Sequence, residues 1–226
     1  MNKIEYANKS WSFENKTISE NFNTHVREQL PWYDMVSDAV AYIARNYLTE
    51  GERITDHGSS TGNMINKLLP LIIERKATIH GIEKSFSMYQ KMQERFFDSH
   101  LECLSLEAGD ICDYGFEESQ IHIIFLTLMF VPVHKRKELL DVIKQKTKKG
   151  GVIIIVDKVL DHNGYFATVL KRLGMHWKIE QGAMLEDVIK KEMSLAGVQI
   201  PIDLELVKDG KEFFRMGEFA GWVIEV

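Results

Sequence analysis

The sequence of 226 residues predicts an α/β fold: a doubly wound, mostly parallel seven-stranded sheet with an N-terminal helical cap. Three observations predict it. Short runs of β-branched residues alternate with longer stretches whose apolar residues recur every three or four positions, as in a sheet covered by helices. The last part, 202–226, instead reads as two successive strands. The stretch before residue 49 has only helical patterns.

The N-terminal stretch, 11–48, predicts two helices separated by Leu30-Pro31-Trp32-Tyr33, because a proline inside a helical pattern ends the helix. We therefore expect a helical cap over 1–48 and a cofactor-binding region over 49–226, packed as one compact unit.

Five parallel strands are expected from runs rich in Ile, Val, Leu and Thr. They lie at 52–56, 77–82, 101–106, 121–126 and 151–157. The helices between them are expected at 62–74, 85–97 and 134–147. Gly150-Gly151 reads as the stop of the last of these helices.

The C-terminal third predicts a helical region over 166–196 and then an antiparallel pair of strands. Asp209-Gly210 is a common hairpin turn, so we expect Lys208-Asp209-Gly210 to join the two strands. An antiparallel pair that follows five parallel strands gives the sheet a reversed edge.

The composition excludes several classes of protein. The hydrophobic fraction of 45% excludes disorder, and the net charge of −5 disfavours a protein that grips long nucleic acids. The 2 cysteines and 8 histidines lack metal-ligand spacing, so we expect no disulfide framework and no metal site. The polar N-terminus and the short apolar stretches predict a cytoplasmic protein outside the membrane.

The segment 56–62, Asp-His-Gly-Ser-Ser-Thr-Gly, follows the first expected strand and opens a helix. Gly58 allows a tight turn and Gly62 allows close approach of a ligand or a helix. The free N–H groups of the helix favour an anionic group. The G-x-x-x-G spacing, with Ser60 in the middle, differs from the dinucleotide pattern, and a plain strand-to-helix turn is the alternative.

Two acidic residues follow later strands and could bind a nucleoside. Glu83 comes about twenty residues after Gly62, where a carboxylate accepts from a ribose diol. In Gly109-Asp110-Ile111, Asp110 could accept from an adenine amino group while Ile111 packs on the ring. The alternatives are a helix-start carboxylate for Glu83 and an Asx turn at Asp110.

Together these motifs resemble the nucleoside-binding motifs of class I S-adenosylmethionine-dependent methyltransferases, and the last two expected strands resemble that family's reversed strands. The resemblance implies a Rossmann-like fold with S-adenosylmethionine, or its carboxylated form, as cofactor. The cofactor residues it implies are Tyr33, Asp56, Gly58, Ser60, Gly62, Glu83, Lys84, Asp110, Ile111 and Thr127.

Within that superfamily the chain resembles the carboxy-S-adenosylmethionine synthases, a family that works in tRNA wobble-uridine modification. The similar segments are the Pro-Trp-Tyr turn, the Thr-Leu-Met-Phe segment at 127–130 and the pair Asp157-Lys158. Two positions differ. Phe125 stands where the family has a polar residue, and Glu192 stands where the family's arginine grips the added carboxylate.

A carboxylate at position 192 would repel a carboxylated cofactor, so we expect methyl transfer from ordinary S-adenosylmethionine to a small-molecule or nucleic-acid acceptor. Arg27, Tyr33 and Glu192 are the candidates for the acceptor side. The alternatives are carboxy-S-adenosylmethionine synthesis, a nicotinamide-dependent oxidoreductase, and a silent module that binds the cofactor without catalysis. The sequence identifies no acceptor and no catalytic base, and it leaves a homodimer open.

Overall fold

The computed structural model describes residues 12–14, 16–97, 101–113, 115–159 and 164–226, so residues 1–11 of the predicted cap lie outside the described part. Its strands are β1 (Arg53–His57), β2 (Thr78–Glu83), β3 (Leu104–Ala108), β4 (Ser119–Phe125), β5 (Thr147–Lys158), β6 (Lys211–Met216) and β7 (Phe219–Glu225).

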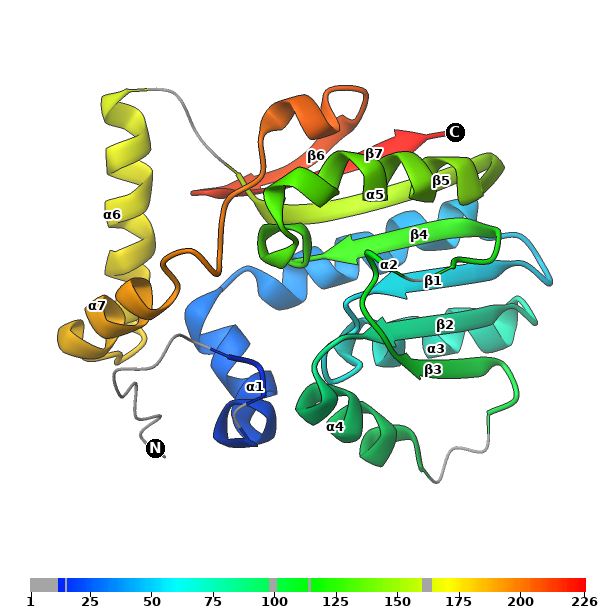
Figure 1. Ribbon diagram of the computed structural model, residues 1–226, viewed down its shortest axis with the longest axis horizontal. Helices are drawn as coiled ribbons and strands as arrows, with labels where there is room; N and C mark the ends of the chain where they lie inside the picture. Colours follow the sequence, from blue (N-terminus) through cyan, green and yellow to red (C-terminus); the bar gives the residue numbers. More distant parts are fainter. Residues whose placement is uncertain (1–11, 15, 98–100, 114, 160–163) are drawn as a thin grey trace.

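All seven strands form one sheet in the order β3-β2-β1-β4-β5-β7-β6 (Figure 1). The first five run parallel, and β7 lies antiparallel between β5 and β6. The strand order reverses between β1 and β4, which defines the topological switch point where such sheets bind ligands. The predicted doubly wound sheet with a reversed edge is confirmed.

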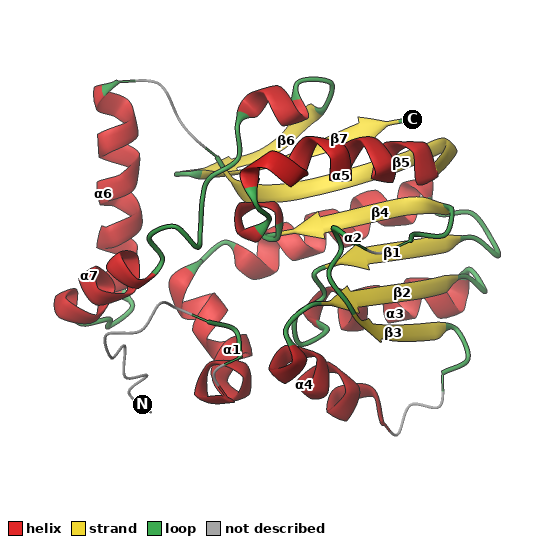
Figure 2. Ribbon diagram, in the orientation of Figure 1, coloured by secondary structure: helices red, strands yellow, loops and turns green. Residues whose placement is uncertain are grey.

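The helices are α1 (Lys16–Gln29), α2 (Tyr33–Tyr47), α3 (Asn63–Glu74), α4 (Phe86–Phe96), α5 (Val133–Lys146), α6 (Tyr165–Glu180) and α7 (Leu185–Ser194), with short 3-10 turns η2 (Leu128–Phe130) and η3 (Leu204–Val207). Figure 2 shows that helices cover both faces of the sheet. Successive β5 residues bury against opposite faces: Ile154 packs in the cluster with α2 and α3, and Ile153 packs in the cluster with α5 and η3.

Helices α6 and α7 stand beside the sheet rather than on it (Figure 1). They pack against each other, and α6 also contacts α1. No residue of α6 is fully buried. The single helical region expected over 166–196 is therefore two helices, separated at Gly182, whose φ of +90° favours glycine.

One predicted turn and one predicted helix stop are wrong, and both involve glycine. Gly217, with φ of +60°, lies between β6 and β7, so the hairpin turn falls there and not at Lys208-Asp209-Gly210. Gly210 instead packs closely, since a Cβ there would lie 3.0 Å from Cβ of Trp222.

Gly150-Gly151 is not a helix stop, because α5 ends at Lys146 and β5 already begins at Thr147. A Cβ on Gly151 would lie 2.2 Å from the carbonyl oxygen of Gln120. This glycine therefore lets β5 approach the neighbouring strand β4 at a register shift. Among the described helices, none is long and apolar enough to cross a lipid bilayer.

Candidate functional site

A cavity of about 390 Å³, here named the central pocket, lies at the carboxyl ends of β1, β2 and β4. All the residues predicted for the cofactor except Gly62 line it: Tyr33, Asp56, Gly58, Ser60, Glu83, Lys84, Asp110, Ile111 and Thr127. The topology brings them together because parallel strands end at the same edge of the sheet, next to the switch point.

The loop after β1 has left-handed backbone at three positions: Gly58 (φ +77°), Ser60 (φ +52°) and Gly62 (φ +78°). A Cβ on Gly58 would lie 2.5 Å from Oγ1 of Thr127, so only glycine fits there. A Cβ on Gly62 would lie 2.6 Å from the ring of Phe96. Gly62 therefore serves close packing of α3 against α4, which explains why it does not line the pocket.

Glu83, at the end of β2, holds this loop in place. One carboxylate oxygen accepts from the backbone N–H of Ser60 at 2.7 Å, and the other accepts from the N–H of Ser85, also at 2.7 Å. Burial raises the pKa of Glu83, and the two backbone N–H groups oppose that shift. Each oxygen keeps a further lone pair, so the side chain can hold the loop and accept from a ribose diol in the pocket.

Asp56, at the end of β1, is fully buried. Its Oδ2 atom has no hydrogen-bond partner within the described part of the chain. Burial raises its pKa to about 7, and the nearby Glu83 adds to that shift. A buried carboxylate oxygen without a partner is costly, so a cationic ligand group in the central pocket would stabilise this site.

The far end of the central pocket contains Asp110, whose carboxylate accepts from Nζ of Lys84 at 2.7 Å and from the N–H of Cys112 at 2.9 Å. Burial alone would raise the pKa of Asp110, but these two donors outweigh it and lower the pKa. Ile111 is buried beside it. A charged acceptor next to an apolar side chain is the arrangement expected for an adenine.

The end of β4 forms one wall of the central pocket. Leu126 has a φ of +58°, which is unusual for a branched residue and marks strain. The next turn is held by Asp157, whose carboxylate accepts from the N–H of Thr127 at 3.0 Å and of Leu128 at 2.7 Å. The strained turn thus presents Leu126 and Thr127 at fixed positions.

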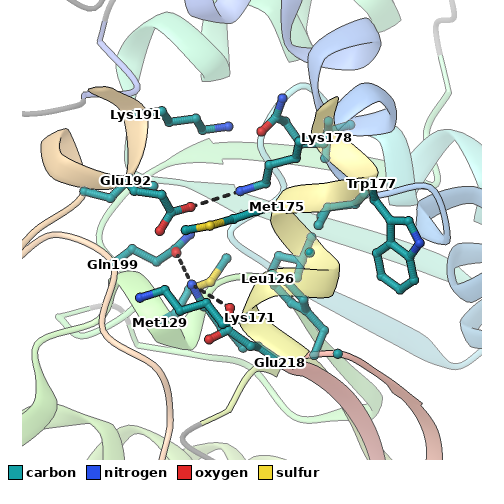
Figure 3. Close-up of a pocket in the computed structure, with 18 of the residues that line it drawn as sticks. Leu126, Met129, Lys171, Met175, Trp177, Lys178, Lys191, Glu192, Gln199 and Glu218 are labelled. Atoms are coloured by element: carbon teal, nitrogen blue, oxygen red, sulfur yellow. Dashed lines mark hydrogen bonds and ion pairs between the residues drawn. The ribbon is translucent and has the colours of Figure 1, made fainter. Parts of the chain in front are cut away.

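Figure 3 shows a second cavity, which has a volume of about 150 Å³. The two cavities share four lining side chains: Phe13, Phe22, Leu126 and Phe130. Because four lysines line the second cavity, we name it the lysine pocket. These lysines are Lys158, Lys171, Lys178 and Lys191.

Glu192 lies in the lysine pocket and not in the central pocket. Its carboxylate accepts from Nζ of Lys178 at 2.9 Å. Burial would raise the pKa of Glu192, but Lys178 together with Lys158 and Lys171 outweighs burial and lowers it. The expected repulsion by Glu192 is therefore largely neutralised by a lysine that the sequence motifs did not reveal.

Arg27 lines neither pocket. Its guanidinium donates to the carboxylate of Asp34 at 2.8 Å and lies 5.4 Å from the ring centre of Tyr33. Tyr33 reaches the central pocket, where its hydroxyl accepts from the amide of Asn63 at 3.2 Å. The structure thus brings Tyr33, but not Arg27, to the site.

Sequence patterns pointed to Glu192 and Lys158 in the lysine pocket, but they missed its other charged residues and did not show that these residues lie together. His25 comes from α1, Lys158 from β5, Lys178 from α6 and Lys191 from α7. No spacing along the chain links four such elements, and only their packing brings them together. Among the described residues, no group of three or more His, Cys, Asp and Glu could hold a metal ion.

Comparisons with known proteins agree with this geometry. The sequence profile of a family described as "Methyltransferase domain" matches residues 54–151. A carboxy-S-adenosyl-L-methionine synthase from Staphylococcus epidermidis is 30% identical over 97% of the chain and 92% of the relative. A carboxy-S-adenosyl-L-methionine synthase from Sulfurimonas denitrificans is 26% identical over 91% of both chains.

Solved structures show the same fold. Human N-acetylserotonin methyltransferase in complex with S-adenosylmethionine has a TM-score of 0.60 at 14% identity, over 95% of this chain and 58% of that one. An S-adenosylmethionine-dependent methyltransferase from Clostridium acetobutylicum has a TM-score of 0.51 at 19% identity, over 62% of this chain and 58% of that one.

Proposed function

Because the chain belongs to the carboxy-S-adenosyl-L-methionine synthase family of class I methyltransferases, we propose that it transfers a methyl group from S-adenosylmethionine to a small acceptor in the lysine pocket. The observation that carries this proposal is the shared wall between two cavities: one has the predicted cofactor residues, and the other is lined by lysines. An acceptor in the lysine pocket would face the cofactor across Leu126 and Phe130.

When bound, S-adenosylmethionine supplies an electrophilic methyl group on a positively charged sulfur. The residues of the central pocket fit it. The unpartnered Oδ2 of Asp56 would pair with the ammonium of its methionine part, Glu83 would accept from the ribose hydroxyls, and Asp110 with Ile111 would hold the adenine. Positioning of donor and acceptor supplies much of the acceleration in such a transfer.

The acceptor proposed for the lysine pocket is a small molecule with an anionic group and an apolar body. Lys158, Lys171 and Lys178 supply cations, and the walls include Met175 and Trp177. Electrostatic complementarity of this kind selects the partner more than it adds affinity.

A second candidate is carboxy-S-adenosyl-L-methionine synthesis, the activity named for the relatives. The ion pair between Lys178 and Glu192 favours it, since it removes most of the repulsion expected for an added carboxylate. Under this candidate the product would serve tRNA modification, as the resemblance implies. We also place the protein in the cytoplasm, consistent with free thiols at Cys103 and Cys112. The homodimer stays a prediction, for light scattering to test.

Two measurements test these proposals. S-adenosylhomocysteine is expected to raise the melting temperature and NAD is not, because only a ligand of the folded state stabilises it. Equal stabilisation by NAD would contradict the assignment of the central pocket. Mass spectrometry of the nucleoside that copurifies separates the candidates, since a carboxylated nucleoside would favour the synthase and reject simple methyl transfer.

A further inference from the structure

Lys191 lies at an unusual place for a lysine. Its amino group lines the lysine pocket and lies 2.9 Å from Nε2 of His25, which is buried on α1. Figure 3 shows Lys191 and Lys178 extending into the same cavity from α7 and α6. This contact of the amino group is with an imidazole, which lacks the negative charge of a carboxylate.

The charged groups around Lys191 come from three elements and from the turn before β7. Lys178 and Lys171 lie on α6, Lys158 on β5, Glu192 on α7, and Glu218 before β7. The two carboxylates already pair with lysines: Glu192 lies 2.9 Å from Lys178, and Glu218 lies 3.6 Å from Lys158. The pocket therefore keeps an excess of positive charge around the amine.

This environment favours the neutral amine. Burial, with the charges of Lys178 and Lys158, lowers the pKa of Lys191 to about 7, although Glu192 opposes the shift. Burial and the same lysine cluster lower the pKa of His25 to about 3, so its imidazole is neutral as well. At pH 7 about half of such an amine is neutral, against roughly one part in 2,500 for an ordinary lysine.

A neutral lysine in a buried pocket beside another cation is the arrangement that adds to carbonyl groups. The neighbouring cations also attract a carboxylate, so a ligand with both a carbonyl and a carboxylate matches the whole pocket. A cavity of about 150 Å³ fits a small molecule of this kind.

We propose that Lys191 forms a Schiff base with a small keto acid in the lysine pocket, a covalent step that goes beyond the methyl transfer proposed above. The amine adds to the carbonyl carbon, and one N–H proton moves to the carbonyl oxygen. The hydroxyl then leaves with the second N–H proton as water, and a C=N bond remains. His25 acts as a positioning residue that orients the amine, and Lys178 or Lys171 holds the carboxylate.

The test uses pyruvate as the probe on the purified full chain. Sodium cyanoborohydride reduces any imine to a stable amine, and peptide mass spectrometry locates the labelled lysine. At pH 7 we expect labelling of Lys191 to exceed that of its exposed neighbour Lys190 by about 100-fold or more, because far more of its amine is neutral. Acetone, which lacks the carboxylate, is expected to label Lys191 less than pyruvate does.

Variants separate reactivity from structure. Lys178→Met removes the cation beside the amine, so the pH at which labelling is half-maximal is expected to rise. His25→Gln keeps a hydrogen-bond partner for the amine, so it is expected to preserve part of the labelling. Lys190→Met is the matched control and should change nothing at Lys191. Equal labelling of Lys191 and Lys190 in the wild type would overturn the proposal, even if no variant folds.

The rise in melting temperature with S-adenosylhomocysteine tests the methyl-transfer proposal independently of the labelling of Lys191. Loss of that stabilisation with selective labelling of Lys191 would reject the methyl donor and keep the Schiff base. Stabilisation without selective labelling would reject only the Schiff base.

Discussion

Glu83 combines two tasks at one side chain, because it holds the backbone of Ser60 and faces the central pocket. Charge-assisted hydrogen bonds contribute about 1.5–3 kcal/mol, so Glu83→Ala is expected to weaken binding of S-adenosylhomocysteine by roughly 10- to 150-fold. Calorimetry measures this change. Since the carboxylate is buried, we also expect a lower melting temperature, and Glu83→Gln, which keeps one acceptor oxygen, should fall between the two proteins. Unchanged affinity for S-adenosylhomocysteine in both variants would show that Glu83 only holds the loop and does not bind the cofactor.

Asp56 should make cofactor binding depend on pH. Its pKa is raised to about 7 by burial, so the carboxylate that pairs with an ammonium forms only as the pH rises through that value. We expect S-adenosylhomocysteine to bind about 10-fold more tightly at pH 8 than at pH 6, since the ionised fraction of a group of this pKa changes by about that factor. Calorimetry of Asp56→Asn at the same two pH values is the control: the dependence should disappear. A pH dependence that persists in Asp56→Asn would assign it to another group.

At the scale of elements, residues 12–14 pack against the start of α4, beside the central pocket. The carboxylate of Glu14 accepts from the N–H of Phe86 at 3.0 Å and of Ser87 at 3.3 Å, at the start of α4. The ring of Phe13 lies 5.0 Å from that of Phe130 and lines both pockets. This segment therefore covers the boundary between the two cavities.

Weakening this cover should speed the release of ligand. A carboxylate at a helix N-terminus contributes about 0.3–1 kcal/mol, so Glu14→Gln is expected to raise the dissociation rate of S-adenosylhomocysteine by roughly 2- to 5-fold. Stopped-flow measurements give this rate. The exposed Glu28 on α1 provides the control, because Glu28→Gln removes a charge from the same region without touching α4. The same acceleration in both variants would point to net charge instead of the contact.

The elements that sequence predicts best are those whose local pattern agrees with their tertiary environment. The central strands β4 and β5 are buried on both faces because helices cover both, so their runs of Ile and Val predict strands clearly. Glycine is the weaker signal, since one residue type serves turns, close packing and strand pairing. Gly217 makes the hairpin turn, while Gly210 and Gly151 are required by neighbours that are distant in sequence.

Most of the central pocket could be predicted because its residues follow successive strands in one stretch of chain, as is typical of nucleoside sites in doubly wound sheets. The lysine pocket could not. His25 and Lys191 approach to 2.9 Å although they lie near opposite ends of the chain. No periodicity or motif contains a contact that depends on how α1 packs against α6 and α7.

At the scale of the whole molecule, a buried histidine pair between β1 and β4 makes the stability of the fold depend on pH. Nε2 of His57 lies 2.9 Å from Nδ1 of His122, and both rings are fully buried. Burial lowers the pKa of His122 to about 4, so the folded protein keeps this ring neutral while the unfolded chain takes up protons below about pH 6.5. The contribution of the neutral His122 ring to the free energy of unfolding is therefore complete above pH 6.5. It is lost as the pH falls towards 4.

Relative to His122→Gln, the wild type is expected to lose about 2 kcal/mol of unfolding free energy between pH 7.5 and pH 5. Urea unfolding at the two pH values measures it. The glutamine can still accept from His57, which keeps the pair hydrogen bonded. Asp56 and Asp157, whose pKa values burial raises to about 7, act in the opposite direction, but their effect cancels between the two proteins. Parallel pH profiles would show that the pair does not titrate on unfolding.

Because the two cavities are built from different parts of the chain, the residues of each can change separately during evolution. Most residues that line the central pocket, where we propose that the methyl donor binds, lie within the stretch that the methyltransferase profile matches, 54–151. Helices α1, α6 and α7 lie outside it. Under the proposed function, substitutions in these peripheral helices would alter the acceptor without disturbing the loop at Gly58 or the carboxylate of Glu83. A common ancestor could therefore give rise to enzymes that share a donor and differ in the molecule they modify, with selection acting on two nearly independent sets of residues.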